Sequence, residues 1–150
     1  MVPVGGIANE AGAKSTPDGY TLLTAPGSSL TAVTHLQPVR FDPLKDFVPI
    51  SSIGYFDGLF ISNAASEYRT LQDFIKTARE KPGTLNYSSA GSGSTQHLAG
   101  ALFNLRTGTR IVHVPYKGSA PALTALIAGD VQLAFVNPVA IGQHVRSGRL

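Results

Sequence analysis

The residues best suited to bind a ligand lie in the stretch NYSSAGSGSTQHLAGALF, residues 86–103. Its centre, Ala90–Thr95, is a run of glycine and small hydroxyl residues between an apolar segment and an amphipathic one. Glycine lets a backbone approach a ligand closely, and serine or threonine supplies hydroxyl partners at the start of a helix. Capping alone would need one such residue. We therefore interpret the turn as an anion-binding site made of backbone N–H groups and hydroxyls.

This turn lacks the standard catalytic and cofactor motifs. GSGSTQ has no third glycine of the dinucleotide fingerprint, and no acidic residue closes the next predicted strand. No Gly-Lys-Ser/Thr occurs, and the G-x-S-x-G nucleophile elbow is absent. One enzymatic alternative stays open: a small serine hydrolase or transferase with Ser92 or Ser94 as nucleophile and His97 as base, since positions 94 and 97 are neighbours on a helix. We favour a protein that is not an enzyme, because no acid orients that histidine.

The histidines do not form a metal-binding pattern. None pairs with another histidine or a carboxylate at ligand spacing, and cysteine is absent, so we expect no metal and no cofactor. His97 and His113 fit packing or supporting roles better than metal ligation. The histidines are His35, His97, His113 and His144.

The elements that position the turn follow one repeated pattern, in which a short apolar strand leads through a small polar turn into an amphipathic helix. A separate helix over residues 71–80 precedes them, with Thr70 and Asp73 as a capping-box variant and Pro82-Gly83 as its end. The predicted strands are residues 85–89, 111–116 and 131–136. The predicted helices start near Ser94, at a Ser119 cap with Pro121 in the first turn, and at an Asn137 cap followed by Pro138; they end at Gly108, Gly129 and Gly148.

Apolar spacing also predicts which face of each helix is buried. The expected buried residues are Leu98, Ala101, Leu102 and Leu105 in the first helix, Leu123, Leu126 and Ile127 in the second, and Ile141 and Val145 in the third.

Alternating strands and helices at this spacing indicate an α/β fold with a parallel sheet flanked by helices. Parallel strands place the N-termini of the following helices at one edge, where open α/β sheets bind their ligands. Hydrogen-bond partners there would come from Ser92, Ser94, Thr95, Ser119 and Asn137. A carboxylate suits such a set of donors. Lys117, beside Gly118, either counters the anion or is simply solvated.

We expect little regular secondary structure in residues 1–48. A Pro-Asp-Gly turn leads into a predicted strand, Tyr20–Thr24, which ends at Pro26-Gly27. Residues 47–63, FVPISSIGYFDGLFISN, read as two extended apolar segments.

Composition excludes several classes of protein. The net charge of +3 comes from 12 basic and 9 acidic residues without a basic cluster, which argues against nucleic-acid binding. No apolar run is long enough for a membrane span, and the N-terminus lacks the pattern of a signal peptide, so we expect a soluble chain.

Five motifs in order resemble those of the Bug, or TctC-like, family: PDGYTLL, FDPLKDFVPISSIG, LNYSSAGSGSTQHLAGALF, IVHVPYKGSAPALTALIAGDVQLAF and VRSGRL. These are extracytoplasmic solute-binding receptors of tripartite tricarboxylate transporters. The resemblance implies a periplasmic-binding-protein fold of type II, with two α/β lobes around a cleft, and a periplasmic location. It also implies a small carboxylic or amino acid as solute and membrane permease subunits as partners. The residues it places at the cleft are Ala90, Gly91, Ser92, Gly93, Ser94 and Thr95, the loop Ala25–Ser29 with Gly27 and Ser28, and Phe135–Asn137.

The resemblance also implies that family members are longer. They begin with a signal peptide, a first strand and a glycine-rich loop, and continue past the point where this sequence ends. We therefore expect residues 51–148 to form the second lobe and residues 1–50 to be a remnant of the first, as in a truncated gene product or a partial receptor that closes its core by dimerising. Such a chain should bind its ligand weakly, and exposed apolar surface should make it self-associate.

Overall fold

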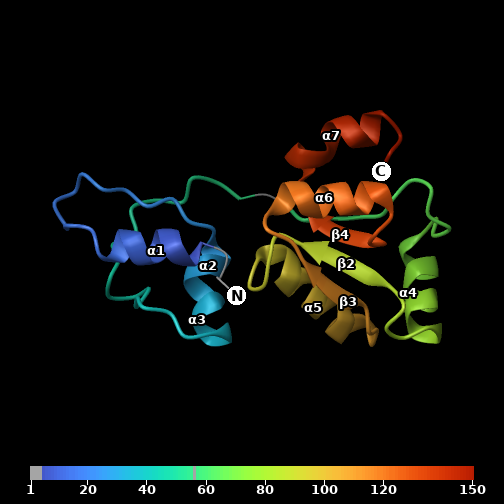
Figure 1. The fold of residues 1–150 in the computed structure, drawn as a ribbon, viewed down its shortest axis with the longest axis horizontal. Helices are drawn as coiled ribbons and strands as arrows, with labels where there is room; N and C mark the ends of the chain where they lie inside the picture. The colour runs from blue at the N-terminus through green and yellow to red at the C-terminus, as the bar shows by residue number, and fades with distance from the viewer. Residues whose placement is uncertain (1–4, 56) are drawn as a thin grey trace. The chain divides into compact units, whose positions relative to one another are not determined.

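The computed structural model describes residues 5–55 and 57–150, and these fall into two compact units (Figure 1). The first unit contains residues up to 55 together with 92–94, and the second contains the remainder of the chain. The Gly-Ser turn is thus divided, because residues 92–94 group with the first unit. The second unit contains the sheet and the predicted residues Ala90, Gly91, Thr95, Lys117, Gly118, Phe135 and Asn137.

The sheet of the second unit is mixed, with the strand order β1-β4-β2-β3. Its strands are β1 (Leu59–Ile61), β2 (Asn86–Ser89), β3 (Val112–Pro115) and β4 (Leu133–Val136). β2 pairs in parallel with both β3 and β4, whereas β1 runs antiparallel to β4. The predicted α/β class and the three parallel strands are confirmed.

Four helices accompany these strands in the second unit (Figure 1). They are α4 (Leu71–Glu80), α5 (Thr95–Thr107), α6 (Ser119–Ala128) and α7 (Pro138–Arg146). α5 and α6 both pack on β2 and β4. Figure 1 shows the two helices on opposite faces of the sheet, so that the strands are covered on both sides.

The alternation of side chains along β4 divides the core into two clusters. Leu133 packs with Phe74, Tyr87 and Ile111 on one face, whereas Ala134 packs with Leu126 of α6 on the other. The first cluster is rich in aromatic rings: Phe60 and Phe74 meet edge to face with centroids 5.3 Å apart. Buried aromatic area of this kind contributes most of the stabilisation of a small core.

The start of α4 is a capping box, as its sequence predicts. The Asp73 N–H donates to Thr70 Oγ1 at 3.1 Å, and the Thr70 N–H donates to Asp73 Oδ2 at 3.0 Å. The reciprocal bonds satisfy two N–H groups that a helix start otherwise leaves unpaired.

The predicted buried face of α5 is wrong. Leu102 and Leu105 are 53% and 79% exposed, and Ala101 is exposed as well. The helix instead turns Gly100 toward Tyr87, so closely that an added Cβ would lie 2.1 Å from Tyr87 Cε2. Because only glycine fits against this ring, the bulk of Tyr87 decides which face of α5 meets the sheet.

Two details of the later helices also differ from prediction. The N-cap of α6 is Gly118, without a side-chain cap, and Ser119 is the first helical residue. Val145 of α7 is 50% exposed, whereas Ile141 is buried as predicted. The Asn137 cap is confirmed, since its side chain accepts the Val139 N–H at 2.8 Å. α6 buries Leu126 together with Ala122 and Ala125, while Leu123 and Ile127 are half-buried.

The first unit contains the short helices α1 (Gly6–Ala13), α2 (Gly27–Thr31) and α3 (Val33–Leu36). Asn9 joins α1 to α2 through a buried bond from its Nδ2 to the Ser29 carbonyl oxygen at 3.0 Å. The predicted strand Tyr20–Thr24 is wrong, because this segment has no regular structure and Tyr20 is 92% exposed. The turn before it does form, with Asp18 Oδ1 accepting the Tyr20 N–H.

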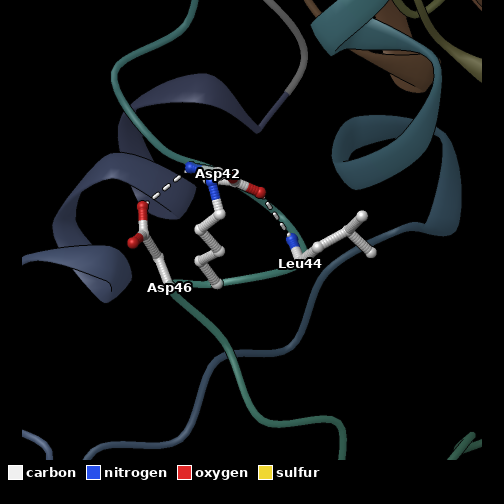
Figure 2. Close-up of polar contacts among 4 residues, drawn as sticks. Asp42, Leu44 and Asp46 are labelled. Atoms are coloured by element: carbon white, nitrogen blue, oxygen red, sulfur yellow. Dashed lines mark hydrogen bonds and ion pairs between the residues drawn. The ribbon is translucent and has the colours of Figure 1, made fainter.

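A second turn of this unit is built on aspartates (Figure 2). The Asp42 N–H donates to Asp46 Oδ2 at 2.7 Å, and Asp42 Oδ1 accepts the Leu44 N–H at 2.9 Å. The Leu44 bond, together with Lys45, lowers the pKa of Asp42. The extended segment predicted after this turn has no strand over residues 47–55, and position 56 lies outside the described residues. Among the described residues of 47–63, β1 is the part that forms a strand.

Candidate functional site

The carboxyl ends of β2, β3 and β4 lie at one edge of the sheet, because the three strands are parallel. α5, α6 and α7 begin within a few residues of these ends, at Thr95, Ser119 and Pro138. Helix N-termini carry partial positive charge and unpaired N–H groups. The edge therefore has the polarity that the sequence predicted for an anion site.

A small crevice of about 10 Å³ opens between β2, β4, α5 and α6. It brings together three residues predicted for the site, Ala90, Ser119 and Phe135, and none of its lining residues is acidic or basic. The lining residues are Ser88, Ser89, Ala90, Gln96, Ser119, Ala122, Ala134, Phe135 and Val136. A volume of this size holds about one water molecule. The crevice is therefore too small to enclose a molecule of several heavy atoms.

Gln96 is a residue of this crevice that the sequence argument missed. Its Nε2 donates to Ser119 Oγ at 3.4 Å, which joins the first turn of α5 to the first turn of α6. Its position directly after the small-residue turn was the available signal, because the first turn of a helix faces whatever that turn binds.

The N–H of Gly91 is already used within the protein. It donates to Ser89 Oγ at 3.1 Å, and the Ser89 hydroxyl in turn approaches the Gly91 carbonyl oxygen at 3.2 Å. Gly91 has a φ of 130°, a conformation that L side chains rarely adopt. The glycine is therefore required by the backbone of the turn, and its N–H is not available as a ligand donor in this arrangement.

Ser89 also contacts a histidine that lies inside a stack of rings. Ser89 Oγ lies 2.6 Å from His113 Nε2. The His113 ring stacks on Tyr87 at 5.0 Å and on His97 at 4.1 Å between centroids. The packing roles expected for both histidines agree with this arrangement.

Burial perturbs all three rings of this stack. It lowers the pKa of His113 to about 4, with a further contribution from the neighbouring His97, and it lowers the pKa of His97. Burial likewise raises the pKa of Tyr87 to about 12. The stack is consequently uncharged at neutral pH.

The Ser89–His113 contact has the distance of a nucleophile and its base, but its environment does not suit catalysis. Ser89 is 1% exposed, so a substrate cannot reach its hydroxyl. An imidazole with a pKa near 4 is also a weak general base at neutral pH. Within residues 5–55 and 57–150 no group of three or more His, Asp or Glu side chains is placed to hold a metal ion.

The remaining predicted residues of the second unit lie around this edge in different roles. Lys117 is exposed after the end of β3, and Gly118 has a φ of 115° before α6. Asn137 caps α7.

The predicted site residues of the first unit lie in α2 or in the segment 92–94. Gly27 opens α2, followed by Ser28. Gly93 has a φ of 80°, and an added Cβ there would lie 2.9 Å from Val33 Cγ2, so this glycine is required by close packing on α3. Ser94 is buried and Ser92 is half-buried.

Solved structures similar to this chain are periplasmic binding proteins. A chain described as "R. palustris Rpa4515 with adipate" matches with a TM-score of 0.87 and 36% identity, over 96% of this chain and 48% of that one. MatC (Rpa3494) from Rhodopseudomonas palustris with bound malate matches with a TM-score of 0.85 and 28% identity, over 96% and 49%. A structure described as a periplasmic transporter gives a TM-score of 0.86 at 33% identity, over 96% and 49%.

The family model described as "Tripartite tricarboxylate transporter family receptor" matches residues 3–150. Protein BugT of Bordetella pertussis is 38% identical over 97% of this chain and 45% of its own length. A protein from the tcbD-tcbE intergenic region of Pseudomonas sp. strain P51 is 32% identical over 96% of this chain and 43% of its own length. The chain belongs to this receptor family, as its motifs indicated, and it spans less than half the length of these relatives.

Proposed function

We propose that this chain is the ligand-contacting part of a solute receptor, in which the carboxyl edge of the β4-β2-β3 sheet meets a carboxylate of a small organic acid. The observation that carries the proposal is the convergence of helix N-termini and small residues on one crevice that has no acidic lining residue. A carboxylate accepts charge-assisted hydrogen bonds from N–H and hydroxyl donors and is favoured at the positive end of a helix.

The neighbouring structures support the class of solute. Two similar chains were solved with adipate and with malate, which are both small dicarboxylates. The contact residues we propose are those at the turns: Ala90, Gly91, Ser92, Gly93, Ser94 and Thr95, with Gly27, Ser28, Lys117, Gly118, Phe135 and Asn137. Among these, Gly91 contributes backbone shape, because its N–H is bonded to Ser89.

NMR titration of the chain with adipate and with malate tests this function, because it detects weak binding. We expect shifts confined to resonances of the turns, with a weak affinity, since a shallow crevice offsets little of the entropy lost on association. Adipamide, which has the same carbon chain without charge, is the matched control and should cause no shift. Equal shifts with adipate and adipamide would contradict the role of the carboxylate.

We further propose that the protein carries out no chemical step. Its family consists of receptors, His97 is stacked on His113, and burial lowers the pKa of His97, which weakens it as a base. A covalent serine probe tests the hydrolase alternative. Labelling of Ser92 or Ser94 would revive that alternative.

Family membership also supports a cellular location and transport partners for the whole protein. We propose a periplasmic location and delivery of the solute to membrane permease subunits. No helix in the described part of the chain is long and apolar enough to cross a membrane. Residues 51–148 would then be one lobe of the receptor and residues 1–50 part of the other. Cell fractionation and pull-down of the permease with the full-length receptor test these assignments; recovery in the cytoplasm would overturn the location.

A further inference from the structure

We infer that His113 is a positioning residue for the ligand-binding turn: its hydrogen bond to Ser89 fixes the hydroxyl that holds Gly91, and ligand affinity depends on that bond. The inference rests on the function proposed above and assigns a role to two residues, Ser89 and His113, that the predicted site did not include.

The hydroxyl of Ser89 lies at the centre of three polar contacts. It accepts the Gly91 N–H at 3.1 Å, approaches the Gly91 carbonyl oxygen at 3.2 Å, and lies 2.6 Å from His113 Nε2. A hydroxyl has one proton to donate and two lone pairs, so these three contacts use its full capacity. Ser89 is also buried, so losing a partner costs more there than at the protein surface.

Packing holds the His113 ring in the position that reaches Ser89. Tyr87 and His97 stack on it at interplanar angles of 29° and 19°. Tyr87 is itself fixed, because its Oη donates to the His97 carbonyl oxygen at 3.2 Å and Gly100 of α5 lies directly against its ring. A continuous set of contacts thus leads from α5 to the turn that precedes it.

The surroundings of this set keep the imidazole neutral. The titratable groups that stack on His113 are Tyr87 from β2 and His97 from α5. No carboxylate occurs in β2, β3, β4 or α5. The single charged residue in these elements, Arg106, lies nine positions beyond His97, in the last turn of α5. A neutral His113 offers Nε2 as a fixed partner for the hydroxyl across the physiological pH range.

Three single variants of the 150-residue chain test the inference, together with the double variant that combines His113→Phe and Ser89→Ala. His113→Phe keeps an aromatic ring in the stack and removes the hydrogen bond. Ser89→Ala removes the same bond from the other side, together with both contacts between the hydroxyl and Gly91. His113→Gln places an amide near the position of Nε2 and is the conservative variant, which we expect to retain adipate affinity.

Two measurements are made on each variant: amide exchange of Gly91 without ligand, and affinity for adipate by NMR titration. We expect His113→Phe to speed Gly91 exchange and to weaken adipate binding by about fivefold, as for loss of one buried hydrogen bond. Ser89→Ala should have at least this effect in both measurements, because it also removes both contacts with Gly91. The double variant should be no weaker than Ser89→Ala alone, because that variant already removes the contact with His113. His113→Gln should lie near the wild-type chain in both measurements.

The outcomes separate this inference from the proposed function. If the wild-type chain does not bind adipate or malate, both fall. If the wild-type chain binds and His113→Phe and Ser89→Ala bind equally well, the positioning role falls and the proposed function stands. Additive losses of affinity in the double variant would also overturn the positioning role of His113. Thermal melts show whether each variant is folded, and Ser89→Ala provides the test if His113→Phe does not fold.

Discussion

Gly100 shows how one missing side chain decides a packing arrangement. An added Cβ would lie 2.1 Å from Tyr87 Cε2, well inside van der Waals contact, so the tyrosine ring or α5 would have to move. We expect Gly100→Ala to lower the free energy of unfolding by about 1–3 kcal/mol, even though alanine favours a helix by about 1 kcal/mol.

Urea denaturation of the chain measures this change. Gly142→Ala in α7 is the matched control, because its Cβ would meet only Arg146 Nη2 at 3.5 Å among the described residues. The control should be neutral or slightly more stable. Equal effects of the two substitutions would show that Tyr87 does not set the packing of α5.

His113 gives the stability of the second unit a defined pH dependence. Burial, followed by the charge of His97, lowers the pKa of His113 from 6.5 to about 4 in the folded chain. Between these values the unfolded chain binds more protons than the folded chain, so acidification favours unfolding. The contribution of His113 is complete above pH 6.5 and is lost progressively as the pH falls toward 4.

Thermal melts at pH 7 and pH 5 test this dependence. The melting temperature of the wild-type chain should drop on acidification, and the drop should be smaller in His113→Gln, which has no titratable group at this position. His97 contributes in the same direction, since burial also lowers its pKa. An equal drop in both proteins would rule out His113 as the source.

At the scale of the element, the buried face of α5 differs from the face that apolar spacing predicts. Its leucines repeat at helical spacing, yet Leu102 and Leu105 are exposed, and Phe103 packs into the aromatic cluster. We expect Leu105→Lys to change the free energy of unfolding by less than about 0.5 kcal/mol. Phe103→Ala should cost about 3 kcal/mol, because it removes ring contacts with Phe60 and Phe135.

Denaturant melts of the two variants compare the faces directly. Leu105→Lys tests the exposed face and Phe103→Ala the packed one, and each serves as the reference for the other. A larger loss in Leu105→Lys than in Phe103→Ala would mean that the predicted face is the buried one after all.

The elements that the sequence predicted correctly are those fixed by local chemistry. The Thr70–Asp73 capping box, the Asn137 cap with Pro138, and the glycine at the end of α6 each depend on residues within one turn. The face of α5 depends instead on Tyr87, which lies 13 positions before Gly100. Such a contact is decided by the fold and leaves no periodic signal.

The same distinction applies to the candidate site. The small residues of the turn were visible because capping and anion binding are local. The contact of Ser89 could not be predicted in this way, because its partner His113 is distant in sequence. The two residues come within reach only because the strand register sets Tyr87 opposite His113. Tyr20–Thr24 failed for a related reason: a strand needs a paired neighbour, and residues 5–55 contain none.

At the scale of the whole molecule, the segment 48–55 is a candidate for contact between copies of the chain. Val48, Ile50, Ile53 and Tyr55 are each at least 79% exposed, and residues 48–55 contain no charged side chain. Isolated exposed apolar residues are common, but several within one uncharged segment favour association. We expect reversible self-association that increases with concentration and with salt.

Light scattering over a concentration series measures this association. Replacing Ile50 and Ile53 with serine should lower the apparent mass at high concentration, because it removes apolar area while leaving charge unchanged. Val139→Ser is the matched control: Val139 is 86% exposed but lies on α7, away from this segment in sequence, and its loss should leave the association unchanged. A monodisperse monomer at all concentrations would show that segment 48–55 does not drive contact between copies.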